Sequence, residues 1–421
     1  MIQGKNIRMR NLFILTLVSM VACKPMPPSN DAGNAIPPSP YHASQQTQIP
    51  VSRSSLPAPA NSYVPAPQVR YQHKKVAFLV PLSAPSAEIG KAMLDAAMLG
   101  LFDVYANAPV HEGAARIQLM PYDTPADPKL SAKVAQEAID DGAQVIIGPL
   151  YASSVAAVAP IAKRHNIPMI NFSNNIGVTG AGNYTLGFMP AEQVLKVLDA
   201  TMARGDKKIA ALLPASPYGD VVEEAVIDHT DAHATELVGV AHYPLDGSNI
   251  APYVQRLIGN TSEKDPLPFD ALVVAEGGET FIQLLKDLKK FRVTPDKVHY
   301  LGTGLLDDRS LLGIADGIGT WYATTPSAMY EGFSTRFEAE YDYRPPRLAS
   351  LGYDAVALVA YLLEQGGVTE TIMTRYHGFE LPANGLIRFH QDGSNQRSLA
   401  VMALGAHTME EIMPAQRVLP E

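Results

Sequence analysis

The stretch that decides the fold is VIIGPLYASSVAAVAPIAKRHNIPMINFSNN, residues 145–175. An apolar run over residues 145–147 ends at Gly148-Pro149, and a helical pattern then continues to about Ala162. A second apolar run over residues 167–170 ends in a turn rich in Ser and Asn. This order of strand, helix and strand predicts a unit of a parallel α/β sheet.

Both turns of this unit carry small hydroxyl or amide side chains at the carboxyl ends of the predicted strands. Open α/β sheets bind ligands at this edge, where helix N-termini also offer free N–H groups to anions. The alternative is that Gly148-Pro149 and the Ser/Asn cluster serve only the geometry of the turns. The stretch taken by itself leaves both interpretations open.

Length, composition and charge limit the class of protein. A chain of 421 residues exceeds one ordinary domain and predicts two α/β lobes. An apolar share of 47% and a charged share of 18% fit a globular protein with a sizeable core. A net charge of −9, without a basic stripe, argues against nucleic acid as a partner.

The first 23 residues have the pattern of an export signal rather than of a folded segment. Basic residues precede an apolar run over residues 12–18, which is too short to span a membrane, and no later stretch is long enough. The segment ends in Cys23, the only cysteine of the chain, which has no partner for an intramolecular disulfide. We therefore expect lipid attachment at Cys23, with a stray cysteine in an ordinary signal peptide as the alternative.

Residues 24–74 are predicted to be a disordered linker. They are rich in proline, with Ser, Ala, Asn and Gln between, and show no apolar periodicity that a core could bury. A Pro-rich chain of this length reaches on the order of 150 Å at full extension, which would hold the folded part well away from a membrane.

Strands and helices alternate from Lys75 onward and predict two doubly wound parallel-sheet lobes. Strands are expected at residues 76–82, 117–120, 145–147, 167–170, 209–214, 237–240, 271–275 and 299–302. Helices are expected from residue 89 to about 104 and at 130–139, 192–202, 221–229, 250–258, 280–291, 330–341 and 353–365, besides the one that follows Pro149. Residues 386–390 and 399–404 are expected to form a closing hairpin.

Motifs of enzymes are missing from the sequence. It contains no dinucleotide-binding glycine fingerprint, P-loop, G-x-S-x-G elbow or H-E-x-x-H pair. The histidines are scattered without ligand spacing, which favours surface or core histidines over a metal site. Asp123, Glu276 and Asp307-Asp308 flank strand ends, and solvated loop carboxylates are expected rather than a catalytic acid pair. We predict a protein that is not an enzyme, with no catalytic residue, cofactor or metal.

Six short motifs, in this order, resemble the periplasmic binding protein type I family, in particular its branched-chain amino-acid receptors. They are Val80-Pro81-Leu82-Ser83, Ile147-Gly148-Pro149-Leu150, Ile167-Pro168-Met169-Ile170, Phe172-Ser173, Pro217-Tyr218-Gly219 and Asn384-Gly385-Leu386-Ile387-Arg388-Phe389. The resemblance implies two lobes that are joined by three crossings and enclose an interlobe cleft. The first lobe is expected at residues 75–188 and 326–378, and the second at 189–325 and 379–421.

The resemblance also implies a ligand site in the cleft. In that family, hydroxyl and backbone N–H groups after the fourth and fifth strands hold the carboxylate of the ligand. The matching positions are Ala152, Ser153, Ser173, Asn174 and Asn175. Tyr218 matches the second-lobe tyrosine that closes over the ligand, and Glu276 is the candidate partner of its ammonium group. Asn174-Asn175 depart from the small Ala and Thr residues frequent in the family.

The chain resembles a second group with the same fold, the lipoprotein activators of penicillin-binding proteins. Phe172-Ser173-Asn174, the Ala-rich helix after Gly148-Pro149 and the Pro-rich linker carry this resemblance. Residues 19–23 resemble a bacterial lipobox, and Lys24 after it favours the outer membrane. This group implies a lipid-anchored periplasmic protein whose partner is a peptidoglycan synthase. The alternative is a receptor that delivers a branched-chain type of amino acid to an ABC transporter.

Overall fold

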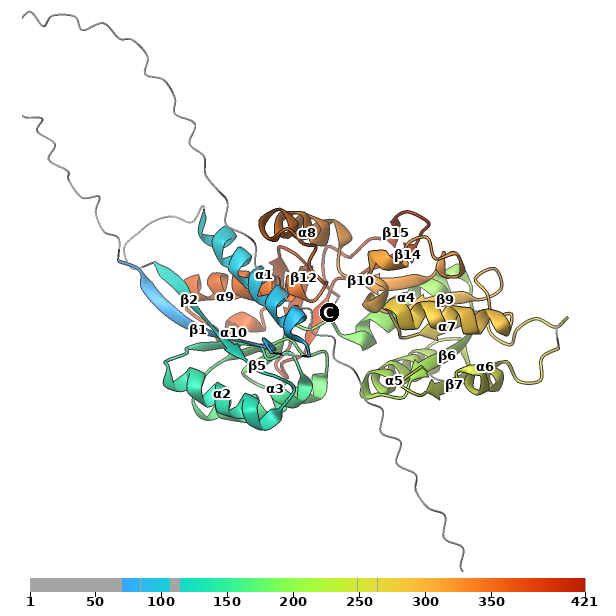
Figure 1. Ribbon diagram of the computed structural model, residues 1–421, viewed down its shortest axis with the longest axis horizontal. Helices are drawn as coiled ribbons and strands as arrows, with labels where there is room; N and C mark the ends of the chain where they lie inside the picture. Colours follow the sequence, from blue (N-terminus) through green and yellow to red (C-terminus); the bar gives the residue numbers. More distant parts are fainter. Residues whose placement is uncertain (1–69, 84, 107–113, 248, 263, 421) are drawn as a thin grey trace, which may run out of the picture. The chain divides into compact units, whose positions relative to one another are not determined.

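The computed structural model describes residues 70–83, 85–106, 114–247, 249–262 and 264–420 (Figure 1). The predicted export signal, Cys23 and residues 24–69 of the predicted linker lie outside these residues. The first strand begins at Gln72, so the predicted start of the folded region at Lys75 falls inside it. Among the helices of the described ranges, none combines the length and the apolarity needed to cross a membrane.

The first lobe contains a five-stranded parallel sheet in the order β2-β1-β3-β4-β5. Its strands are β1 (Gln72–Val80), β2 (Ala115–Asp123), β3 (Val145–Ile147), β4 (Met169–Asn171) and β5 (Asn183–Thr185). Its helices are α1 (Ala87–Ala106), α2 (Pro128–Asp140), α3 (Ala152–Arg164), α8 (Ser327–Tyr341), α9 (Ala349–Glu364) and α10 (Glu370–Met373), with the short η1 (Ile176–Val178). The predicted doubly wound parallel sheet is confirmed.

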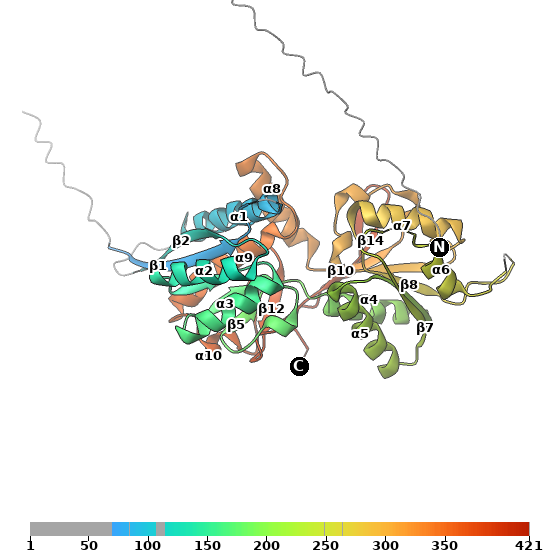
Figure 2. The same ribbon diagram turned by 60° about the horizontal axis from the view of Figure 1, so that its bottom comes forward.

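Helices cover both faces of this sheet (Figure 2). Phe78 of β1 points to the face packed by α1 and α9, whereas its neighbour Leu79 points to the face packed by α2 and α3. Because side chains alternate along a strand, a sheet covered on both faces needs an unbroken apolar run. Gly148 then ends β3 with φ +94°, and a Cβ there would lie 2.1 Å from the Leu79 carbonyl oxygen. No other residue fits this turn without a shift of the backbone.

The second lobe contains a seven-stranded sheet in the order β15-β14-β10-β9-β8-β6-β7, with β14 and β15 antiparallel to their neighbours. Its strands are β6 (Lys208–Pro214), β7 (Glu236–Tyr243), β8 (Ala271–Val274), β9 (His299–Gly302), β10 (Trp321–Thr324), β14 (Ala400–Leu404) and β15 (Met409–Met413). Helices α4 (Pro190–Arg204) and α5 (Pro217–Ala232) pack on one face, and α6 (Ala251–Ile258) and α7 (Gly278–Lys290) on the other. Short turns η2 (Gly304–Leu306), η3 (Arg309–Leu311) and η4 (Ala315–Gly317) follow β9.

A third, antiparallel sheet replaces the predicted closing hairpin. It consists of β11 (Phe379–Leu381), β12 (Gly385–Phe389) and β13 (Asn395–Arg397), whereas β14 pairs with β10 and β15. The predicted hairpin is therefore wrong, because β13 reads Asn-Gln-Arg and gives no apolar signal. The first lobe was expected to end at residue 378. Phe379 and Phe389 pack into the core of the first lobe, so this lobe continues beyond that residue. After β13 the chain returns to the seven-stranded sheet of the second lobe, with β14.

Three segments, at residues 186–189, 325–326 and 398–399, cross between the lobes. Asn395 binds the first crossing, because its Nδ2 donates to the carbonyl oxygens of Thr185 at 2.8 Å and Gly187 at 3.0 Å. On the second crossing, Thr325 Oγ1 donates to Asn384 Oδ1 at 3.0 Å. Side chains of the third sheet and the loop before β12 thus hold two crossings to the first lobe.

Candidate functional site

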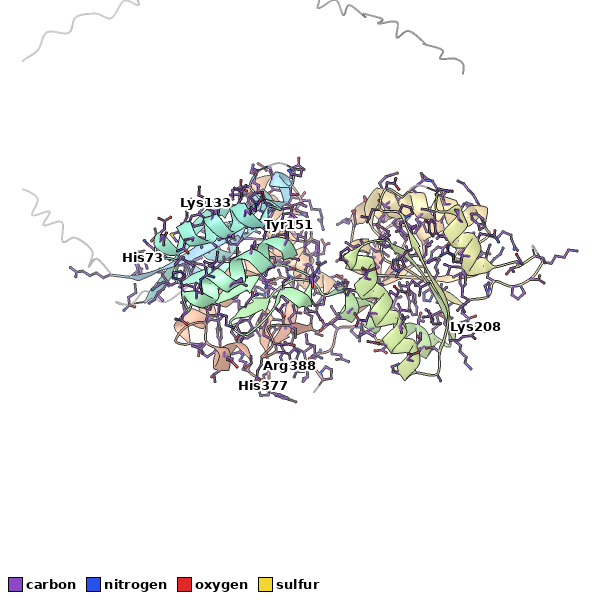
Figure 3. All side chains as sticks on the ribbon, turned by 90° about the horizontal axis from the view of Figure 1, so that it is seen from below. His73, Lys133, Tyr151, Lys208, His377 and Arg388 are labelled. Carbon is purple, nitrogen blue, oxygen red and sulfur yellow. The ribbon has the colours of Figure 1, made fainter. Side chains whose placement is uncertain are left out.

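A pocket of about 470 Å³ lies between the lobes. The first lobe lines it with residues after β3 and β4, and the second lobe lines it with Tyr218 from α5 and residues 304–305 after β9. Its aromatic side chains are Tyr151, Phe172, Phe188 and Tyr218. Figure 3 shows Tyr151 on the side of the first lobe that faces the second, whereas His73 at the start of β1 lies at the opposite end. The size fits a small organic molecule.

The turn after β4 brings only Asn174 of its three predicted residues to the pocket lining. Ser173 is buried, and its Oγ accepts a hydrogen bond from the backbone N–H of Asn175 at 3.1 Å. The Asn175 side chain in turn accepts from the N–H of Gly177 at 2.8 Å and begins η1. For Ser173 and Asn175 the structure therefore shows the turn chemistry that was the alternative to ligand binding.

The turn after β3 presents the N-terminus of α3 to the pocket. Tyr151 and Ala152 line it, whereas Ser153 is exposed and does not. The first N–H groups of an α-helix have no partner within the helix, and Tyr151, which precedes α3, does not cap them with its side chain. Such a helix end attracts the negative charge of a ligand.

Tyr218 stands in the first turn of α5, which Ser216 caps by accepting from the N–H of Gly219. Its hydroxyl donates to Thr303 Oγ1 at 2.8 Å, which links α5 to the turn after β9. Burial raises the pKa of Tyr218 to about 12, and the nearby charge of Glu276 acts in the same direction. The phenol is therefore a protonated hydrogen-bond donor at neutral pH.

Glu276 does not line the pocket. Its Oε1 accepts a hydrogen bond from the hydroxyl of Tyr243 at 2.6 Å. Among the described lining residues there is no Asp or Glu. An ammonium group in this pocket would therefore lack the acidic partner that the sequence assigned to it.

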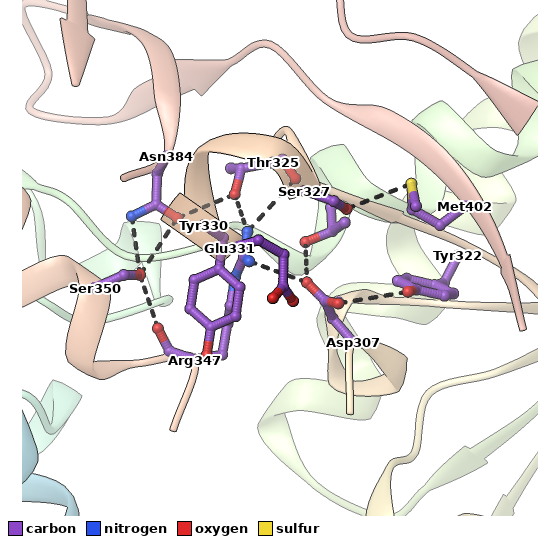
Figure 4. Close-up of polar contacts among 12 residues, drawn as sticks. Asp307, Tyr322, Thr325, Ser327, Tyr330, Glu331, Arg347, Ser350, Asn384 and Met402 are labelled. Atoms are coloured by element: carbon purple, nitrogen blue, oxygen red, sulfur yellow. Dashed lines mark hydrogen bonds and ion pairs between the residues drawn. The ribbon is translucent and has the colours of Figure 1, made fainter. Parts of the chain in front are cut away.

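Arg347 is the one charged residue among the described residues of the lining, and sequence reasoning missed it. Its Nη1 lies 3.2 Å from Asp307 Oδ2, its Nη2 donates to Thr325, and the guanidinium lies 4.0 Å from the centre of the Tyr330 ring (Figure 4). Asp307 also accepts from Thr324 Oγ1 at 3.1 Å. Asp307 was expected to be a solvated loop carboxylate, but only 8% of its side chain is exposed because it pairs with Arg347.

Arg347 also lines a second pocket of about 790 Å³ that shares residues 304–305 with the first. Charged residues are frequent in this second pocket, where Arg344 and Glu331 pair at 2.7 Å. Arg347 thus lines both pockets, of which the second is rich in charged residues and the first is not.

Among the residues that the structure describes, two groups of histidine and carboxylate side chains stand close enough to hold a metal ion, and neither lines the pocket between the lobes. One consists of Asp199, His229 and His233. The expectation that the histidines have no ligand spacing is wrong for His229 and His233, which are four residues apart at the end of α5.

The family model that matches the chain is the one described as periplasmic binding protein, and it covers residues 74–407. An uncharacterized protein of Rickettsia prowazekii is 25% identical over 162 residues, which are 37% of this chain and 40% of that protein. The Leu/Ile/Val-binding protein of Escherichia coli K12 is 30% identical over 96 residues, which are 23% of this chain and 26% of that protein. The chain thus spans less than half the length of either relative.

Solved structures share the fold over most of the chain. A solute-binding protein of an ABC transporter from Rhodopseudomonas palustris BisB5, in complex with 3,4-dihydroxybenzoic acid, has a TM-score of 0.63 at 21% identity and covers 82% of this chain and 98% of its own. A branched-chain amino acid transporter substrate-binding protein of Streptococcus pneumoniae, in complex with isoleucine, has a TM-score of 0.62 at 17% identity and covers 82% and 100%. At these identities the likeness concerns the fold alone.

Proposed function

Because the chain belongs to the periplasmic binding protein family, we propose that it binds a small organic carboxylate in the pocket between its lobes. We further propose that it acts in the periplasm as a binding protein and not as an enzyme. The observation that carries the proposal is the charge of the pocket lining, which contains Arg347 and, among its described residues, no carboxylate.

The polar groups of the pocket favour a ligand with a negative end. The uncapped N-terminus of α3 and the Arg347 guanidinium both line the pocket, and both attract an anion. Asp307 balances part of the arginine charge, so we assign the main role to the N–H groups and a supporting role to Arg347.

The other end of the ligand is expected to be apolar. Phe172, Phe188 and Tyr218 offer aromatic surface, whereas the pocket offers no acid to an α-ammonium group. A carboxylic acid with an aromatic or aliphatic body therefore fits better than a free amino acid. The neighbour with bound 3,4-dihydroxybenzoic acid gives one example of such a ligand in this fold.

Thermal unfolding with a matched set of ligands tests this proposal. Benzoate and 4-hydroxybenzoate are compared with neutral benzamide and with isoleucine. A ligand at a hundredfold excess over its Kd stabilises the folded protein by about 2.7 kcal/mol. We expect a shift with the acids, none with benzamide, and loss of the shift in Tyr218→Ala but not in Tyr376→Ala, which changes an exposed tyrosine outside the lining. A larger shift with isoleucine would contradict the ligand class.

A second function, activation of a penicillin-binding protein, is favoured by the sequence before the described residues. The lone Cys23 at the end of an export signal and the Pro-rich residues 24–69 fit a lipoprotein tethered to the outer membrane. The linker would let the lobes reach a peptidoglycan synthase at the inner membrane. Both functions use the same fold, and a ligand in the pocket is compatible with either.

Anchoring and partner are tested separately. Cys23→Ala is expected to lose palmitate labelling and to move the protein from the membrane to the soluble fraction. The wild type is expected to co-purify with a penicillin-binding protein and to raise its rate of cross-linking. Unchanged fractionation of Cys23→Ala contradicts the anchor, and a synthase whose rate does not respond contradicts the activator.

A further inference from the structure

We propose that Asp199, His229 and His233 form a binding site for a divalent transition-metal ion on the second lobe. The proposal concerns a place away from the pocket and is independent of the function proposed above. Asp199 lies on α4, and the two histidines lie one turn apart at the end of α5. Each of the three side chains offers a ligand atom within 4.8 Å of the others.

The distances within the cluster fit a shared ion. His229 Nε2 lies 2.9 Å from Asp199 Oδ1. Two donor atoms that are each about 2.1 Å from one metal ion lie roughly 3 Å apart, so this pair needs little movement. The rings of His229 and His233 stack with centroids 4.3 Å apart, and the exposed His233 offers a ligand atom within 4.8 Å of those of the other two residues.

The tautomer of His233 is fixed in the form that a metal needs. Its Nδ1 lies 2.8 Å from the backbone carbonyl oxygen of His229, and a carbonyl oxygen only accepts hydrogen bonds. Nδ1 therefore carries the proton, which leaves a lone pair on Nε2. Metal-bound histidines commonly donate their second ring nitrogen to a backbone carbonyl in this way.

His229 gives an independent observation, because it is buried with one nitrogen unpaired. The residue is only 4% exposed, and within the described part of the chain its Nδ1 has no hydrogen-bond partner. Buried polar atoms are nearly always paired, so this buried imidazole is held only through its Nε2, at the contact with Asp199. A metal ion between Nε2 and Oδ1 would hold the imidazole at this one contact by a stronger bond.

The second group, made of Asp220, Glu223 and His242, contains one histidine and two carboxylates. His242 lies between Glu223, 2.9 Å from its Nε2, and Asp220, 3.9 Å from its Nδ1. Its two nitrogens face different carboxylates, and because a metal uses one nitrogen of each ring, this group offers an ion a single imidazole ligand. Of the two groups found among the described residues, the one made of Asp199, His229 and His233 is the one that offers two imidazoles beside a carboxylate.

The donor set selects the metal and sets its role. Two imidazoles and one carboxylate suit Zn²⁺, Ni²⁺, Co²⁺ or Cu²⁺ and not Mg²⁺ or Ca²⁺. Three protein ligands leave a position for water or for a group from outside, and both Asp199 and His233 are exposed. A bound ion would fasten the end of α5 to α4, which begins at the first crossing between the lobes.

Titration calorimetry with ZnCl₂ on the full chain, made without a histidine tag and treated with chelator, tests the site. We expect one equivalent of Zn²⁺ to bind and MgCl₂ to give no signal. His233→Ala and Asp199→Asn change exposed residues and are each expected to weaken binding at least tenfold, whereas His242→Ala keeps the wild-type affinity. Co²⁺ should give visible absorption bands that His233→Ala removes. Equal losses in His233→Ala and His242→Ala, or wild-type binding no tighter than that of His233→Ala, would overturn the proposal.

Discussion

Charged side chains are buried at the crossings between the lobes, whereas the pocket beside them is lined almost entirely by uncharged ones. Arg397 and Asp354 have exposures of 5% and 0%, and the Arg397 Nη2 donates to the Leu186 carbonyl oxygen at 2.6 Å. In the pocket, Arg347 is the single charged residue among the described lining residues, and it too has an acidic partner. Most of the buried charge in this region therefore lies where the lobes are joined, and Arg347 is the part of it that reaches the pocket.

The pKa values at the crossings reflect this burial. Removal from water lowers the pKa of Arg397 to about 10 and raises the pKa of Asp354 to about 6 and that of Glu192 to about 7. Each pKa is thus shifted in favour of the neutral form, because the nearby opposite charges offset only part of the cost of desolvation. Burial also raises the pKa of Tyr218 in the pocket and so favours its neutral form, but this phenol is already neutral at pH 7.

The largest effect is expected from Arg397→Met. The change removes the donor to Leu186 and leaves Asp354 and Glu192 without the cation whose charge lowers their pKa values. Loss of one partner of a buried charge cluster costs about 3–5 kcal/mol. Denaturant unfolding measures the free energy, with Arg164→Met, at an exposed position in the last turn of α3, as the control near zero. A cost below about 1 kcal/mol would mean that the crossings are no more dependent on charge than the surface is.

A smaller effect with a defined pH dependence is expected from Glu192→Gln. The folded-state pKa of about 7 lies above the value of 4.5 for the free group, so Glu192 favours the folded protein below pH 4.5 and loses this contribution as the pH rises through 7. At 1.36 kcal/mol per pKa unit the loss is on the order of 3 kcal/mol. Glutamine resembles the protonated acid and still accepts from the Arg397 N–H.

The measurement compares unfolding free energies at pH 4.5 and pH 8. Glu192→Gln should match the wild type at pH 4.5 and exceed it at pH 8. Glu236→Gln, at the exposed start of β7, should follow the wild-type curve at both values. If the two variants behave alike, the charge at the first crossing does not oppose folding.

The sequence predicted the pocket wall better than the crossings, because the contacts at the crossings join residues that are far apart in the chain. Apolar runs and the Pro217-Tyr218-Gly219 motif are local, so most strands and the place of Tyr218 were visible. The partners Asp307 and Arg347 are far apart in the chain, and Arg347 stands in an Arg-Pro-Pro-Arg loop that resembles a plain connection. A single sequence gives no sign of such a pair.

Short strands were missed for a different reason. β5 and β13 have three residues each, read Asn-Tyr-Thr and Asn-Gln-Arg, and show no apolar alternation. Asn183 and Asn395 are buried there because their side chains bond to the crossing segments and to the turn after β4. Tertiary hydrogen bonds, and not the local pattern, set these strands.

In the pocket, Tyr218→Phe is expected to cost little stability and more affinity. The variant keeps the aromatic surface and loses one hydrogen bond, that to Thr303, which is worth about 1 kcal/mol. The single proton of the Tyr218 hydroxyl is donated to Thr303, so a carboxylate can accept it only in exchange for that bond, and the variant removes this exchange. Unfolding with and without benzoate separates the two, and Tyr376→Phe serves as the control outside the lining. A loss of several kcal/mol in the absence of ligand would place Tyr218 with the structural residues of the crossings.

The smallest effect on stability is expected from Asn174→Ala. Asn174 is exposed and lines the pocket, and its side chain makes no hydrogen bond to any described residue. Truncation should therefore change the unfolding free energy by about 0.5 kcal/mol or less. Its neighbour Asn175 provides the contrast within one turn, because Asn175→Ala removes the cap of η1 and should cost about 1 kcal/mol. If Asn174→Ala weakens the binding of benzoate while Asn175→Ala does not, one asparagine serves the ligand and the other serves the turn. The opposite order would return this whole turn to a structural role and leave the N-terminus of α3 as the anion-binding part of the first lobe.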